Sequence, residues 1–278
     1  MFSRRPVLML VAAGAAALGL ARGQETLPLD ATIASAPPGQ AHGHAFARLV
    51  DLDPAIRYLG GALITEDVCI RGHGATIDLG GDFIQVLAGG GPTRLDIDHC
   101  LILYGEHPGL GSYGGGLAYG AGTKGWVENN TFYGNVPSAL YLDVVVLDET
   151  RVVNNLFFGN AGWGFVRNEN QQNLHVRYND SFRNAAGQFG VHCACPFTEP
   201  EPIYPGGLDG ELHFSNFSAD PMIVAEPAPP KVAGDFHLRE GSPCIGAGEG
   251  GLDVGALPYE SPPAALPCGW GALKGLFR

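Results

Sequence analysis

Hydrophobic and polar residues alternate along this chain in short runs. Runs of four to six β-prone residues, such as Ala139 to Leu142 and Arg151 to Asn155, are separated by Gly, Asn or Asp. Such runs, bounded by turn formers, are typical of strands. Within a repeating unit, no stretch of ten or more residues keeps helical spacing without turn formers. The pattern therefore predicts an all-β chain and excludes solenoids built from helices or leucine-rich repeats.

The middle of the chain repeats with a regular step. Three similar segments carry a phenylalanine every 25 residues, namely Phe132, Phe157 and Phe182. Ile77 and Ile102 are also 25 residues apart, and the longer step that follows contains the glycine-rich insert 109–122. A unit of this size buries its apolar face by stacking on its neighbours. We therefore expect one turn of coiled strands per unit, with the strands stacked in parallel.

Asparagines recur at one place in the repeat. They are paired at 129/130 and 154/155, Asn179 stands at the third position, and eleven of the twelve asparagines lie between 129 and 184. At a bend, an inward asparagine can hydrogen-bond to the units above and below it and satisfy the backbone. We interpret this concentration as structural and not as chemistry.

These repeats resemble the right-handed parallel β-helix of pectin-lyase-like proteins. The segment Ile70 to Asp78 is similar to a first coil of that group. Four later segments are similar to the closing pattern of exported bacterial β-helix proteins: Asp220–Ile223, Asp235–Leu238, Gly241–Gly248 and Asp253–Ala256. The resemblance implies one β-helix of about eight coils over residues 60–258. Residues 24–59 would form an N-terminal segment and cap, and 259–278 an irregular C-terminal tail.

The N-terminus has the pattern of a secretory signal peptide over residues 1–23. Arg4 and Arg5 precede an apolar run from Val7 to Ala21, and small residues stand before Gln24. This pattern predicts export to the periplasm, the cell surface or the medium. The paired arginines also resemble the signal of the twin-arginine route. No later stretch is long enough to cross a membrane, so we expect no transmembrane segment after signal removal.

Composition and charge narrow the class of partner. The 42 glycines and 21 prolines follow no three-residue period, which excludes collagen, and only 16% of residues are charged. Three arginines leave with the predicted signal, so the formal net charge falls from −12 to −15. An acidic surface repels phosphate backbones, which argues against nucleic acid as a partner. The oligomeric state is not specified by these features.

Two further predictions concern the ends of the fold and the cysteines. Residues 45–50 have apolar side chains at i, i+3 and i+4, which predicts a short helix that covers the N-terminal end. Cys244 and Cys268 bracket the C-terminal tail and are the best matched pair for a disulfide, whereas Cys100 lies in an apolar strand and is expected to be a free core thiol. The run 192–195 contains one histidine and two cysteines but lacks a second ligand pair for zinc.

The candidate site follows from stacking. Strands that precede each asparagine turn align, and their polar residues should converge on one outer face. The catalytic candidates on this face are Asp143, Arg167, Glu169 and His192, and the substrate-binding candidates are Tyr141, Asn168, Tyr119 and Tyr113. Asp143 and Glu169 could act as an acid/base pair or bind calcium. The alternative is an outward salt-bridge ladder of Asp143, Arg167 and Glu169. A second column with Arg71, Asp96 and Arg151 is interpreted as a solvated sheet face.

The resemblance implies a role with carbohydrate, because lyases, hydrolases and plain binders of polysaccharides share this fold. The Asn-Thr-Asp, Asp-Asp and Arg-Ile-Lys motifs of polygalacturonase-like hydrolases are absent, and Lys124, Lys231 and Lys274 are the only lysines. Two hypotheses therefore stay open. One is an exported polysaccharide lyase or glycoside hydrolase, and the other is a non-catalytic β-helix that binds carbohydrate or interacts with the cell envelope.

Overall fold

The structure is a computed structural model that describes residues 24–108, 114–143, 150–168, 174–192, 198–200, 213–227 and 234–260, with backbone only for 192, 198–200, 213 and 214. Nearly all of its regular elements are short strands, and most of them belong to three parallel sheets. The predicted all-β class with stacked parallel strands is therefore confirmed. Among the described residues, no helix is long and apolar enough to cross a membrane.

The three sheets are named here in the order in which each repeated pass of the chain crosses them, and β1, the first strand of the chain, belongs to sheet II. Sheet I contains β4 (Arg48–Asp51), β7 (Val68–Arg71), β10 (Thr93–Asp98), β13 (Thr123–Lys124), β14 (Trp126–Glu128), β17 (Thr150–Val153), β20 (Leu174–Arg177) and β24 (His213–Phe214). Sheet II contains β1 (Thr26–Pro28), β5 (Arg57–Leu59), β8 (Thr76–Asp78), β11 (Leu101–Leu103), β15 (Thr131–Tyr133), β18 (Leu156–Phe158) and β21 (Asp180–Phe182). Sheet III contains β6 (Ala62–Ile64), β9 (Ile84–Val86), β12 (Gly114–Tyr119), β16 (Ser138–Leu142), β19 (Trp163–Asn168), β22 (Gly187–His192) and β23 (Thr198–Pro200), the last antiparallel to β22.

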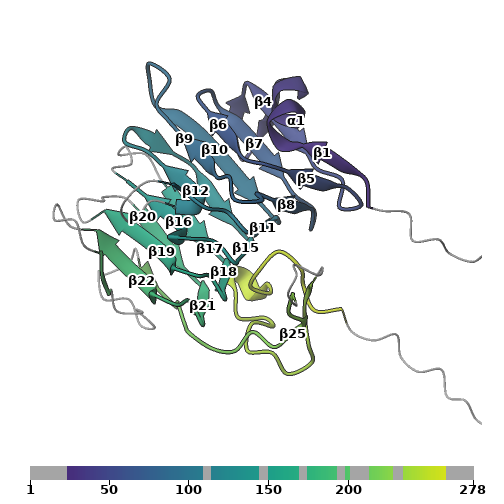
Figure 1. The fold of residues 1–278 in the computed structure, drawn as a ribbon, viewed down its shortest axis with the longest axis vertical. Helices are drawn as coiled ribbons and strands as arrows, with labels where there is room; N and C mark the ends of the chain where they lie inside the picture. The colour runs from purple at the N-terminus through teal and green to yellow at the C-terminus, as the bar shows by residue number, and fades with distance from the viewer. Residues whose placement is uncertain are drawn as a thin grey trace, which may run out of the picture.

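The chain passes through the sheets in a fixed order. In the described residues it runs from sheet I to II to III six times, from β4–β5–β6 to β20–β21–β22, and each strand pairs in parallel with its counterpart in the next pass. Figure 1 shows these strands stacked from purple through teal to green. This arrangement is compatible with the expected β-helix. The parallel sheets begin at β1 and β4, earlier than residue 60.

The interior is a continuous column of apolar side chains. Ile77, Ile102, Phe132 and Phe157 are in register on neighbouring strands of sheet II and are fully buried. The predicted step fails at the next strand, where Ser181 lies opposite Phe157 and Phe182 lies opposite Phe158. The reason is that this unit is one residue shorter, so Asn179 follows Asn155 after 24 residues and side chains of the strand change face.

Asparagines form two buried ladders. The first runs through Asn130, Asn155, Asn179 and Asn216, each side-chain oxygen accepting from the backbone N–H and side-chain amide of the preceding member at 2.9–3.1 Å. This confirms the structural interpretation of these residues. The second ladder, of Asn135, Asn160 and Asn184, lies at the bend between sheets II and III and was not predicted.

The N-terminal cap differs from the expectation. Residues 45–50 are not helical, because β3 (His44–Phe46) pairs with β2 (Gly39–Ala41) in a hairpin and β4 pairs with β7. Sheet pairing of these residues overrides their apolar spacing. The helix is instead α1 (Leu29–Ser35), whose Leu29 and Ile33 are buried in the core one turn apart.

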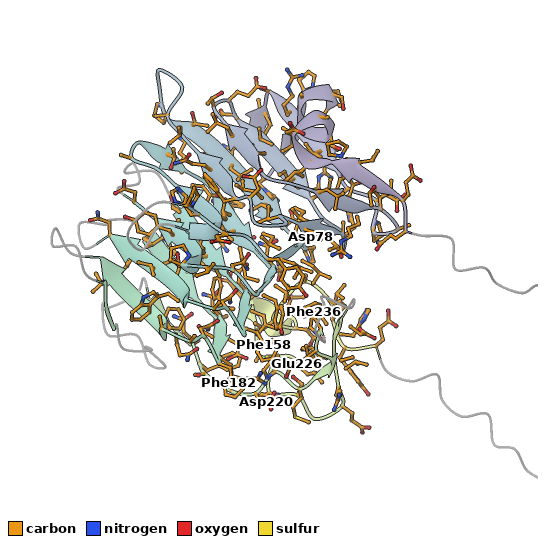
Figure 2. All side chains as sticks on the ribbon, in the orientation of Figure 1. Asp78, Phe158, Phe182, Asp220, Glu226 and Phe236 are labelled. Atoms are coloured by element: carbon orange, nitrogen blue, oxygen red, sulfur yellow. The ribbon has the colours of Figure 1, made fainter. Side chains whose placement is uncertain are left out.

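The C-terminal segment lies against the outer face of sheet II. It contains β25 (Ile223–Ala225), β26 (Asp235–Leu238) and a 3-10 helix, η1 (Glu249–Gly251). Phe236 and Phe158 belong to one apolar cluster between this segment and sheet II, and their ring centroids lie 5.4 and 5.7 Å from that of Tyr133. Figure 2 labels the two phenylalanines. The strands β25 and β26 of this segment pair with each other and add no strand to the three parallel sheets. Cys244 lies in the cluster as a buried free thiol, contrary to the predicted disulfide, and Cys268 lies outside the described residues. Cys100 is free and buried, as expected.

Candidate functional site

The predicted site lies on sheet III, whose strands align as the sequence indicated. Ala118, Tyr141 and Val166 are in register on β12, β16 and β19, and they form one small apolar cluster that Trp163 contacts. Tyr141 is only 3% exposed. At the last strand the alignment shifts, because Gly190 lies opposite Val166 and His192 lies opposite Asn168. This face is more apolar than the sequence implied.

Two of the predicted site residues meet at the C-terminal ends of these strands. The Asn168 side-chain amide donates to the Asp143 carboxylate at 3.2 Å, and both side chains are half-buried. Arg167 lies opposite Leu142 in the register. Since side chains alternate along a strand, Arg167 leaves the opposite face of the sheet from Asp143 and Asn168. The geometry thus brings Asp143 and Asn168 together and sets Arg167 apart from them.

Tyr119 belongs to the interior. It is fully buried, and its hydroxyl donates to the Leu95 carbonyl at 2.7 Å. Burial raises the pKa of this phenol well above its ordinary value. A hydroxyl with this internal partner is not available to a ligand on the outer face, so the structure corrects the prediction that Tyr119 contacts substrate.

Some of the predicted site residues cannot be placed by their side chains. Tyr113, Glu169, Cys193 and Cys195 lie outside the described residues, and His192 is described by its backbone only. The described part of the chain contains no group of three His, Cys, Asp or Glu side chains placed to hold a metal ion. The calcium site at Asp143 and Glu169 stays a prediction, since Glu169 is not described.

An open hollow lies at the N-terminal end of the outer face of sheet III. Its lining is formed by Asp30, Gly61, Ala62, Leu63, Asp82, Phe83 and Gln85. Leu63 and Gln85 are in register on β6 and β9, and Leu63 is 62% exposed. Gln85 is also in register with Ala118, so the hollow continues the column that leads to Tyr141. An aromatic ring, an amide and two carboxylates beside exposed apolar surface make a lining that can contact sugar rings and hydroxyls.

A second polar centre, which sequence reasoning missed, lies on the outer face of sheet I. Asp96 stands between the core residues Leu95 and Ile97, so its side chain points outward, yet it is 0% exposed. Arg94 donates to both carboxylate oxygens at 2.8 and 3.2 Å, and the Trp126 backbone N–H donates at 3.0 Å. The fourth contact is His42 Nδ1, at 2.9 Å.

The Trp126 ring is the centre of this cluster. His42 stacks on it with ring centroids 4.9 Å apart, and His44 meets it edge-on at 6.1 Å. The guanidinium groups of Arg94 and Arg151 lie 5.2 and 5.1 Å from the ring centroid. Cations at this distance from an indole are attracted by its π-system. The ring thereby gathers two imidazoles and two guanidinium groups on one surface.

An ion-pair chain extends this centre toward the C-terminal segment. Arg151 contacts Glu128 at 2.7 Å and Glu249 at 2.9 Å, and Arg177 contacts Glu249 at 3.4 Å. Burial raises the pKa of Glu128, and the Arg151 charge opposes that shift. The interpretation of this column as a solvated face is therefore wrong for Asp96, because the β2–β3 hairpin places His42 over this carboxylate. The alternation of charges along the sequence indicated the column that contains Asp96 and Arg151. The contact between His42 and Asp96 could not be predicted, because the β2–β3 hairpin lies outside the 25-residue repeat.

Comparison with known proteins adds no relative: no protein-family profile, curated protein or solved structure matches the chain.

Proposed function

We propose that the protein is a single right-handed parallel β-helix of the pectin-lyase-like kind, exported by the N-terminal signal, and that it binds polysaccharide at the hollow on the outer face of sheet III. The ordered passage through three parallel sheets and the asparagine ladders support the fold. The observation that carries the binding role is the open hollow of sheet III with Phe83, Gln85 and exposed Leu63.

The shape and chemistry of the hollow suit a polysaccharide ligand. Neighbouring parallel strands are about 4.8 Å apart, so side chains of one column recur along the sheet at that spacing. A chain of sugar units bound at the hollow contacts Leu63 and Gln85. Farther along the same column Ala118, Tyr141 and Val166 are buried, so the contact surface is confined to the hollow. The acidic balance of the protein, −12 over the whole chain, favours neutral over polyanionic polysaccharide unless a cation intervenes.

A second candidate function is cleavage of the bound polysaccharide by a lyase or hydrolase. The Asp143 carboxylate favours it, because Asn168 orients this carboxylate and His192 follows Asn168 in the same column. A carboxylate and a histidine are groups that can transfer protons at a glycosidic bond. The predicted roles of Glu169 and a bound calcium ion belong to this candidate, whereas Arg167 lies on the opposite face of the sheet from Asp143.

Retention on insoluble polysaccharides tests the binding role. The mature protein is incubated with a panel of neutral and acidic polysaccharides, and we expect retention on at least one of them. Gln85→Ala with Leu63→Ser should weaken retention by roughly 1–3 kcal/mol, because an amide contact and apolar surface are lost. Gln40→Ala is the matched control, since Gln40 is exposed on β2 outside the hollow. Retention that the double variant leaves unchanged would place the ligand elsewhere.

Product formation separates the two candidates. The same incubations, with and without calcium, are followed for unsaturated products and reducing ends. Products that disappear in Asp143→Ala would establish the enzyme, whereas retention without any product would establish a binder. Products that persist in Asp143→Ala would show that this carboxylate takes no part.

A further inference from the structure

The imidazole of His42 is presented by the tight turn that connects β2 to β3. His42 and Gly43 connect β2 to β3, with φ of 51° and 77°. Two consecutive positive φ values define the tight hairpin turn in which Asn and Gly are preferred. His73 and His99 also have positive φ values, so this backbone conformation by itself does not distinguish His42. In this protein the turn places the ring on the fully buried Asp96.

Asp96 fixes which ring nitrogen of His42 carries the proton. The bidentate contact with Arg94 compensates the carboxylate charge. A carboxylate only accepts hydrogen bonds, so His42 Nδ1, at 2.9 Å, is the donor. In the neutral imidazole the lone pair is then on Nε2, on the side of the ring away from Asp96.

Part of the His42 side chain reaches solvent. Trp126 covers one face of the imidazole at an interplanar angle of 26°, and Asp96 covers its Nδ1 edge. The His42 side chain is nevertheless 30% exposed. The Arg151 guanidinium also lies over the Trp126 ring, 5.1 Å from its centroid.

The neighbouring thiol is not a nucleophile. Cys69 lies opposite Asp96 in the register and is fully buried. Burial, aided by Asp96, raises the pKa of Cys69 to about 12. Its thiol therefore stays protonated near neutral pH. With His42 as the base, water is left as the attacking group.

We propose that the outer face of sheet I is a second site, in which His42, positioned by Asp96, acts as general base in the hydrolysis of a carboxylic ester. Nε2 accepts a proton from water while the water oxygen bonds to the acyl carbon. The ester C–O bond then breaks, and the imidazolium returns the proton to the departing alkoxide. One water is consumed, and the acid and the alcohol are released. The positive charge of this cluster that could stabilise the developing charge on the acyl oxygen is that of Arg151, whose guanidinium lies over the Trp126 ring.

Hydrolysis of p-nitrophenyl acetate tests this site without reference to polysaccharide binding. We expect wild-type protein to exceed the same concentration of free imidazole, and His42→Gln to lower the rate by about tenfold or more. His99→Gln is the matched control, because His99 also contacts a carboxylate, that of Asp98 at 2.9 Å, but is not one of the residues gathered on the Trp126 ring. Equal losses in the two variants, or a wild-type rate no higher than that of free imidazole, would overturn the proposal.

The role of Asp96 needs its own readout, because Asp96→Asn leaves Arg94 with a neutral partner and can affect folding. Nitrogen NMR of the wild-type protein distinguishes the two imidazole tautomers. We expect His42 to carry its proton on Nδ1. A proton on Nε2 would contradict the positioning role of Asp96, whatever the ester hydrolysis rates are.

Discussion

At the scale of single residues, the ladder asparagines show how one side-chain type supports a stacked backbone. The Asn155 oxygen accepts from the Asn130 backbone N–H at 2.9 Å, and its own amide donates to the Val127 carbonyl at 2.7 Å. All of these groups are buried, so each needs a partner within the protein. The ladder asparagines are therefore explained by the hydrogen bonds that they make to buried backbone N–H and C=O groups, without any catalytic role.

Asn155→Ala should lower the free energy of unfolding by about 2–4 kcal/mol, because it leaves buried N–H and C=O groups of two neighbouring units without partners. Chemical denaturation followed by circular dichroism measures the loss. Asn129→Gly is the control, because Asn129 has a φ of 54° that glycine tolerates and is only half-buried. A loss for Asn155→Ala no greater than that of the control would argue against a structural ladder.

At the scale of elements, packing between units depends on the inner column of sheet II. Phe132 and Phe157 stack with centroids 5.1 Å apart, and Phe165 of sheet III lies 6.2 Å from Phe157. Phe157 thus links the strands of one sheet to those of another. A strand in this fold is stabilised by its neighbours above and below more than by its own three or four residues.

Phe157→Ala should destabilise the protein by about 3–5 kcal/mol, because it removes a fully buried ring and leaves a cavity between two units. The midpoint of denaturant unfolding measures the effect. Leu63→Ala, on an exposed position of β6, should change the midpoint little. Comparable shifts for the two variants would mean that Phe157 is not a central packing residue.

Sequence periodicity predicted most of these elements and failed at defined places. The interval between Phe132 and Phe157 correctly placed two rings in one column, because a repeat of constant length preserves the register. Phe182 was misplaced by one residue, which inverts its face. The helix predicted at 45–50 was wrong, since local apolar spacing does not register that β4 pairs with β7.

At the scale of the whole molecule, the C-terminal segment is attached to sheet II through a buried carboxyl group. Asp180 is fully buried, its Oδ1 accepts from the Ala219 N–H at 3.0 Å, and the Cys244 thiol donates to its Oδ2 at 3.2 Å. Burial raises the pKa of Asp180 to about 7, and the nearby Asp220 adds to that shift. The folded protein therefore binds a proton that the unfolded chain releases at lower pH.

This linkage predicts a pH dependence of stability. The contribution of Asp180 is fully present below its unfolded pKa of about 4 and is lost as the pH rises through about 7. Asp180→Asn should remove this component, so the variant should match the wild-type protein near pH 4 and exceed it by up to about 4 kcal/mol near pH 8. Denaturant unfolding across that range measures the difference.

Asp220→Asn is the control for this prediction, because Asp220 is exposed and should leave most of the pH dependence in place. A difference between wild-type protein and Asp180→Asn that stays constant from acid to alkaline pH would contradict the assignment. Cys244 belongs to the C-terminal segment that covers sheet II, and its thiol donates to Asp180. If ionisation of Asp180 at high pH loosens this segment from sheet II, the Cys244 thiol should become accessible to alkylation.

The sequence by itself determined the all-β class, the stacked parallel strands, the first asparagine ladder and the alignment of β12, β16 and β19. These features are periodic, and a stacked repeat converts spacing along the chain directly into neighbours in space. Only the tertiary structure decided that Tyr119 faces the interior, that the C-terminal segment covers sheet II, and that His42 meets Asp96. Those contacts join segments outside the repeat or depend on which face a strand buries, and no spacing in the sequence encodes them.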